Sequence, residues 1–146
     1  MKPRLYMETT IPSLLTARPS RLIKARAQQE DTRLWWDKMA DRYQIYVSDV
    51  VHQEAAVGEK QKAFERLAIV EAFPFLQVTN EVTQLAEAIE LLGVIPEPCA
   101  NDAAHLALSV VHKMDYLLTW NMKHICSPIS SSVFALSASS QAIQCP

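Results

Sequence analysis

Glycine is nearly absent from this chain, and its scarcity excludes several classes of enzyme. The 146 residues include only two glycines, Gly58 and Gly93, which lie far apart. Phosphate-binding P-loops and the G-x-G-x-x-G turn of dinucleotide-binding folds need several glycines within a few residues. The G-x-S-x-G elbow of the α/β-hydrolases needs a glycine on each side of its serine. None of these motifs can be written into the sequence.

Cysteine is also scarce, and neither sign of charge dominates. The three cysteines form no C-x-x-C pair, which fits a reducing compartment better than a disulfide scaffold, so we expect a cytoplasmic protein. The formal net charge of −2 provides no global positive field, so contact with a polyanion would depend on local patches or a bound metal. Because Glu8 interrupts the N-terminal apolar stretch and no apolar run is long enough to span a bilayer, we expect no membrane association.

Apolar residues are abundant, at 49% of the chain, and their spacing predicts one domain with a substantial core. Short apolar strands alternate with helical patterns, which indicates a parallel sheet covered on both faces in a three-layer α/β/α sandwich. Ser48, Asn80 and Asn101 are the expected N-caps of three helices. Gly93 is the expected C-terminal cap of the second of these. Predicted strands cover residues 4–7, 45–50, 75–78 and 116–120, and predicted helices cover 20–43, 60–72, 80–93 and 101–113, with a short helix between Ser48 and Gly58.

Three acids fall where parallel strands end. Glu8 follows the first strand, Glu54 lies on the helix after the second, and Asp102 lies in the first turn of the helix before the fourth. The carboxyl ends of parallel strands meet at one edge, where open α/β folds bind their ligands. Carboxylates held together repel one another, and Mg²⁺ or Mn²⁺ relieves that repulsion through the oxygen ligands it prefers. Such an ion can polarise a phosphodiester and activate a water molecule.

Each acid also has a purely structural explanation. Glu8 is then an exposed acid at a strand end, and Glu54 is a surface acid of a helix. Asp102 is then a first-turn acid favoured by the helix dipole, which contributes about 0.3–1 kcal/mol.

The segment Asn101–Ile125, NDAAHLALSVVHKMDYLLTWNMKHI, resembles the C-terminal half of a PIN domain, in particular the VapC-like toxins of type II toxin–antitoxin pairs. The resemblance is carried by D-x-x-H-x-A from Asp102 and by D-Y-L-L-T-W-N-x-K-H from Asp115. It implies a central parallel sheet of four to five strands in the order 3-2-1-4, with the fifth at the edge. It also implies a Mg²⁺- or Mn²⁺-dependent endoribonuclease that forms a homodimer and binds a cognate antitoxin in its active-site groove.

The chain departs from the family pattern at two positions of the implied site. Glu8 stands where the family most often has Asp, and Asn121 stands where many PIN domains place a fourth acid. The alternative is therefore a catalytically degenerate PIN-like module that binds RNA or protein without cleavage.

Several neighbours of the acids are candidates for supporting roles. His105, within an apolar helix stripe, is expected to be a buried supporting group rather than a base. The threonines either hydrogen-bond the carboxylates or the substrate phosphate, or simply cap strands. The substrate-contacting or supporting candidates are Thr9, Thr10, Thr119, Asn121, His105 and Lys123, with His124 as a further phosphate contact.

The composition changes towards the C-terminus. Residues 127–140 contain seven serines and no charged residue. We therefore predict a PIN-like domain over residues 1–126 and an atypical Ser-rich tail over 127–146, with a remnant edge strand near Ala142. The region of Trp35, Trp36, Met39 and Tyr43 is predicted to lie partly at a subunit contact, because a small domain has limited room to bury two adjacent tryptophans.

Overall fold

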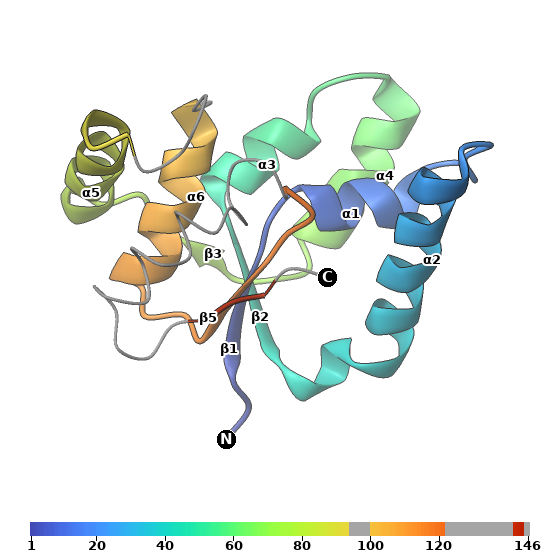
Figure 1. Ribbon diagram of the computed structural model, residues 1–146, viewed down its shortest axis with the longest axis horizontal. Helices are drawn as coiled ribbons and strands as arrows, with labels where there is room; N and C mark the ends of the chain where they lie inside the picture. The colour runs from blue at the N-terminus through green and yellow to red at the C-terminus, as the bar shows by residue number, and fades with distance from the viewer. Residues whose placement is uncertain (94–99, 122–141, 145–146) are drawn as a thin grey trace.

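A parallel sheet forms the centre of the computed structural model, which describes residues 1–93, 100–121 and 142–144 (Figure 1). Within these ranges five parallel strands are ordered β3-β2-β1-β4-β5. They are β1 (Arg4–Met7), β2 (Gln44–Ser48), β3 (Phe75–Leu76), β4 (Tyr116–Leu118) and β5 (Ala142–Gln144). The predicted order is confirmed. The strand order reverses between β1 and β4, so the expected binding edge lies where these two strands end.

Helices cover both faces of the sheet, which confirms the predicted α/β/α sandwich (Figure 1). One layer holds α5 packed against α6, and in the other α1 contacts both α2 and α4. The described helices are α1 (Thr10–Thr16), α2 (Ile23–Lys38), the 3₁₀ helix η1 (Ala40–Arg42), α3 (Asp49–Ala55), α4 (Lys60–Val70), α5 (Asn80–Leu91) and α6 (Ala100–Val111). No helix in these ranges has both the length and the apolar character needed to cross a membrane.

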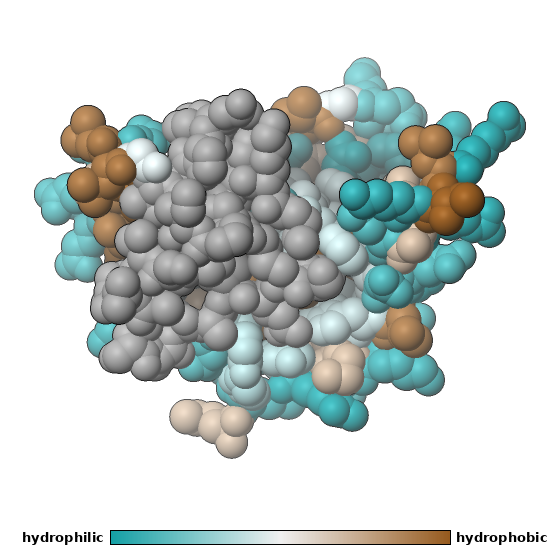
Figure 2. All heavy atoms as spheres, viewed as in Figure 1, coloured by the Kyte–Doolittle hydropathy of each residue, from teal (hydrophilic) through white to brown (hydrophobic). Residues whose placement is uncertain are grey.

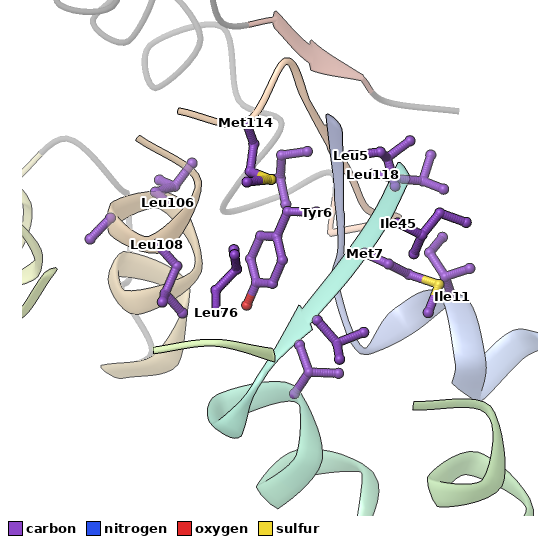
Figure 3. Close-up of a cluster of buried hydrophobic side chains, with 14 of the residues drawn as sticks. Leu5, Tyr6, Met7, Ile11, Ile45, Leu76, Leu106, Leu108, Met114 and Leu118 are labelled. Carbon is purple, nitrogen blue, oxygen red and sulfur yellow. The ribbon is translucent and has the colours of Figure 1, made fainter. Parts of the chain in front are cut away.

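The core is built around β1, whose residues Leu5, Tyr6 and Met7 are fully buried. Successive side chains of a strand point to opposite faces, so this one strand supplies both layers. Figure 3 shows Tyr6 directed towards α6, whereas Met7 lies beside Ile11 of α1. The end of β1 is therefore fixed by packing on both sides.

The sequence did not predict α1, which begins two residues after Glu8. Pro12 is the third residue of α1, where a missing N–H costs little because the first four N–H groups of a helix have no intrahelical partner. The helix after it is also shorter than the predicted span of 20–43, since α2 ends at Lys38 and η1 follows.

Two predicted caps are wrong and two are confirmed. The Thr79 hydroxyl, not Asn80, accepts the N–H of Val82 at the start of α5, and Asn101 lies inside α6. The Ser48 hydroxyl caps α3 as predicted. Gly93 follows α5 with a positive φ of +63°.

The predictions for the C-terminal region and the tryptophans have different outcomes. The boundary between residues 126 and 127 lies outside the described residues and stays a prediction, although β5 pairs with β4 at the sheet edge. Trp35 stacks on Tyr43 at 5.8 Å, and Trp36 meets Phe73 edge-on at 5.9 Å. Both indoles pack within the chain, so lack of room no longer argues for a subunit contact.

Candidate functional site

Glu8 directly follows β1, and three hydrogen bonds hold its buried carboxylate. Oε2 accepts from the Thr10 backbone N–H at 3.0 Å, from the Thr10 hydroxyl, and from the Thr119 hydroxyl at 2.8 Å. None of these donors carries a charge, and no hydrogen bond reaches Oε1 from the described residues. A buried carboxylate with only neutral partners has an unmet preference for a positive charge.

Glu54 projects from α3 towards the same edge. Its Oε1 accepts from the Thr9 hydroxyl at 2.5 Å and lies 2.7 Å from His105 Nε2, while its Oε2 accepts from the Asn101 amide at 3.2 Å. Burial raises the pKa of Glu54, but the hydrogen bond and charge of His105, with the bonds from Thr9 and Asn101, outweigh it and lower the pKa overall. Glu54 therefore stays ionised under mildly acidic conditions.

His105 of α6 is 1% exposed and joins Glu54 to the core. Its Nδ1 lies 2.7 Å from the Tyr6 hydroxyl, which lies 2.8 Å from the Ser48 hydroxyl. Nε2–H can donate to Glu54 Oε1, at 2.7 Å, while Nδ1 faces the Tyr6 hydroxyl. Burial is the largest cause of the raised pKa of Tyr6, so its proton is retained. This arrangement fits the supporting role expected for His105.

Asp102 lies in the first turn of α6 and pairs with Asn121. Its Oδ1 accepts from the Asn121 amide at 2.9 Å, and the Asn121 backbone N–H donates to the Thr119 hydroxyl at 2.9 Å. The structure thus connects Asp102 to Glu8 through Asn121 and Thr119. It does not include Asp102 in the tightest group of potential metal ligands among the described residues, which is Glu8, Glu54 and His105.

The three predicted threonines all donate to the acids. Thr9 bonds Glu54, and both Thr10 and Thr119 bond Glu8. Of the two explanations left open by the sequence, carboxylate support therefore agrees with the geometry. Lys123 and His124 lie outside the described residues.

The acids open into a cavity of about 460 Å³. One wall is Trp120, whose backbone N–H donates to the Thr10 hydroxyl at 2.9 Å and whose indole Nε1 donates to the Thr32 hydroxyl at 2.7 Å. The lining residues are Glu8, Thr9, Thr10, Ser13, Leu14, Gln28, Glu54 and Trp120. The volume lies in the range of about 300–1,000 Å³ that small-ligand sites occupy.

The donor set fits a small divalent cation. One ligand atom from each of Glu8, Glu54 and His105 lies within 4.8 Å of the other two. Both nitrogens of His105 already have partners, so the carboxylate oxygens are the natural donors. Oxygen ligands suit Mg²⁺ or Mn²⁺, which also keep several water molecules.

Sequence reasoning missed three contributors to the site. Tyr6 looked like an ordinary apolar strand residue, and Asn101 looked like a cap. Trp120 was included in the fourth strand, yet β4 ends at Leu118. The tryptophan beside the polar residues that follow was the available signal, because a strand-end aromatic next to acids can form a site wall.

Comparison with known proteins supports the fold. No family model and no curated protein matches the chain. Among solved structures, a toxin–antitoxin complex from Klebsiella pneumoniae is similar, with a TM-score of 0.60, 17% identity, and coverage of 86% of this chain and 92% of that one.

Two further structures are similar over nearly the whole chain. FitAcB from Neisseria gonorrhoeae has a TM-score of 0.60 and 17% identity, covering 95% of each chain. VapBC2 from Rickettsia felis, bound to a DNA fragment from its promoter, has a TM-score of 0.55 and 14% identity, covering 97% of this chain and 98% of that one. The chain therefore has a PIN-like α/β/α fold, shared with a chain of each of these three structures.

Proposed function

We propose that this chain is a Mg²⁺- or Mn²⁺-dependent endoribonuclease and the toxin of a type II toxin–antitoxin pair. The observation that carries the proposal is Oε1 of buried Glu8, which accepts no hydrogen bond from the described residues and belongs to a carboxylate close to Glu54 at the carboxyl edge of a parallel sheet. Two carboxylates held close together repel one another, and a bound divalent cation relieves that repulsion. The shared fold with toxin–antitoxin complexes supports the same assignment.

The proposed roles follow from the contacts of each acid. Glu8 and Glu54 hold the cation, and Asp102 completes the site from the start of α6. A bound divalent cation would polarise the phosphodiester and lower the pKa of a water molecule. Thr10 and Thr119 hold Glu8 through Oε2, which leaves Oε1 without a hydrogen bond from the described residues and therefore available to a cation. His105 keeps Glu54 ionised, which suits a cation ligand better than a proton acceptor.

The direct test is cleavage of a panel of RNAs with added Mg²⁺ or Mn²⁺ and with EDTA. Cleavage should require the cation and should be lost in Glu8→Gln. A matched control is Glu59→Gln, which removes an exposed acid at the start of α4 and should leave cleavage unchanged. Undiminished cleavage in EDTA would rule out the metal mechanism.

A second candidate is the degenerate module that binds RNA or protein without cleaving it. It is favoured by Asn121, a neutral residue that donates to Asp102 where a fourth acid would add charge. Calorimetric titration with Mn²⁺ separates the two candidates. The nuclease should bind Mn²⁺ and lose that binding in Glu8→Gln, whereas the degenerate module should show no Mn²⁺ binding that depends on Glu8.

An antitoxin partner, a homodimer and a cytoplasmic location complete the proposal. Apolar atoms are visible over α5 and over the start of α2 (Figure 2). The exposed large apolar residues of these segments are Leu91, Leu92, Leu22 and Ile23. Clusters of exposed apolar side chains are typical of protein contact surfaces. Co-purification with a separately encoded small protein, and sedimentation at micromolar concentration, test the partner and the dimer.

A further inference from the structure

The cavity beside the acids is divided into a charged end and an uncharged end. Glu8 and Glu54 form the charged end, and no lysine or arginine is among the described residues that line it. A phosphate can therefore approach only where a cation offsets the carboxylates. The rest of the lining is uncharged and includes Trp120, Leu14 and Gln28, which offer an aromatic ring, an apolar side chain and a carboxamide.

Trp120 is held in place at both ends. Its backbone N–H bonds the Thr10 hydroxyl, which also donates to Glu8, so the residue starts beside the acids. Its indole Nε1 bonds Thr32 on α2, one helical turn from Gln28. An aromatic ring whose orientation is already fixed loses little conformational freedom when a ligand stacks on it.

Gln28 gives the same wall a polar group with unused capacity. Its backbone carbonyl accepts from the Thr32 hydroxyl at 2.6 Å, but no described residue hydrogen-bonds its side-chain amide. A carboxamide carries both donors and an acceptor, which match the edge of a nucleobase.

We propose that Trp120 and Gln28 form a nucleobase subsite, in which the base next to the scissile phosphate stacks on the Trp120 indole and meets the Gln28 carboxamide. The inference rests on the proposed ribonuclease function and specifies how the substrate is held. Stacking on aromatic side chains is the usual means by which proteins bind unpaired RNA bases. The subsite thus selects single-stranded RNA, because a paired base could not reach the ring.

The test measures binding rather than cleavage. Fluorescently labelled RNA oligonucleotides, intact or with one abasic position moved along the strand, are titrated by anisotropy in low-salt buffer with Ca²⁺, a divalent cation that takes oxygen ligands and offsets the charge of the carboxylates. Removing the base at one position should weaken binding to the wild type by roughly 5- to 100-fold. Trp120→Leu retains apolar volume but has no ring. It should bind intact RNA as weakly as the wild type binds the abasic strand, and its affinity should not fall further when the base is removed. Trp120→Phe should keep most of the affinity, and a cooperative thermal transition in each variant verifies folding.

The outcomes separate this proposal from the one it rests on. Three results would overturn the base subsite: the same abasic loss of affinity in the wild type and Trp120→Leu, no loss at any abasic position, or no RNA binding by any variant. The first two results would instead suit a protein partner whose side chain packs on Trp120. Metal-dependent cleavage without base dependence would overturn the subsite alone. Base-dependent binding without metal-dependent cleavage would overturn only the nuclease function.

Discussion

Replacing Asn121 by aspartate tests the polar edge of the site with almost no change in side-chain size. The Asn121 amide donates to Asp102 Oδ1 at 2.9 Å, so Asn121→Asp exchanges a hydrogen bond for two facing carboxylates. Without metal, the like charges should raise the pKa of the pair and destabilise the fold. With a divalent cation bound, the added acid becomes a further ligand or neighbour of the ion, and the same substitution should strengthen binding.

The magnitude follows from the contact. A hydrogen bond to a charged group contributes about 1.5–3 kcal/mol. Two unit charges roughly 3 Å apart repel by about 1–5 kcal/mol between a water-like and a surface-like dielectric. Because Asn121 is half-buried and the side chains can rotate apart, we expect a net destabilisation of about 2–4 kcal/mol at neutral pH. For a chain of this size that lowers the melting temperature by roughly 5–15 °C.

The assay is thermal unfolding of the wild type, Asn121→Asp and Asn121→Ala between pH 4 and 7, with EDTA or Mn²⁺. A carboxyl with a raised folded-state pKa contributes stability that is present at low pH and lost as the pH rises, so the deficit of Asn121→Asp should grow from pH 4 to 7. Asn121→Ala loses the donor without adding charge, so its deficit should not depend on pH in this way. Mn²⁺ should raise the melting temperature of Asn121→Asp more than that of the wild type. Equal pH dependence in the two variants and equal Mn²⁺ shifts would refute the reasoning.

Three further predictions concern the acids and the buried network. Asp102→Asn should abolish RNA cleavage but change the free energy of unfolding by less than about 1 kcal/mol, because an amide oxygen can still accept from Asn121. A larger loss of stability in a urea titration would support a structural role for Asp102 instead. Tyr6→Phe should cost about 1–3 kcal/mol of stability in the same assay, since it leaves His105 Nδ1 without its buried partner and leaves the Ser48 hydroxyl with only the Val51 N–H that it accepts at the start of α3. Because the pKa of Glu54 is lowered in the folded state, its carboxylate stabilises the fold above the ordinary carboxyl pKa of about 4.3, and this stability is lost as the pH falls. Glu54→Gln should therefore make the free energy of unfolding fall less steeply towards acid pH. The same steepness in the wild type and the variant would contradict the lowered pKa of Glu54.

The elements with strong periodicity could be predicted from the sequence. The strands around Leu5, Ile45 and Leu117 are short and apolar because their sheet is buried on both faces. The alternation of strands and helices then leaves few architectures. What the pattern did not reveal was α1, since Thr-Ile-Pro-Ser-Leu-Leu has too few residues for a periodic signal and contains a proline.

The site was predictable as a set of residues but not as a set of contacts. Parallel topology alone places Glu8 and Glu54 at one edge. The distribution of hydrogen bonds depends on side-chain directions that sequence spacing does not determine. Asn101 could be recognised as polar and near a helix start, yet its amide donates to Glu54 because α6 begins at Ala100, two residues earlier than an N-cap at Asn101 would place it.

Glu8 illustrates how a departure from a family pattern is accommodated by its neighbours. In place of the usual aspartate, the extra methylene moves the carboxylate further from the end of β1. Thr10, two residues on, and Thr119, just past β4, then bind the same oxygen, Oε2, and fix the longer side chain. A glutamate without these donors would lose rotamer freedom on binding a cation, whereas this one is ordered before any ion arrives. The threonines on both sides of the strand-order reversal are therefore as much a part of the candidate centre as the acids, because they occupy Oε2 and leave Oε1 available to a cation.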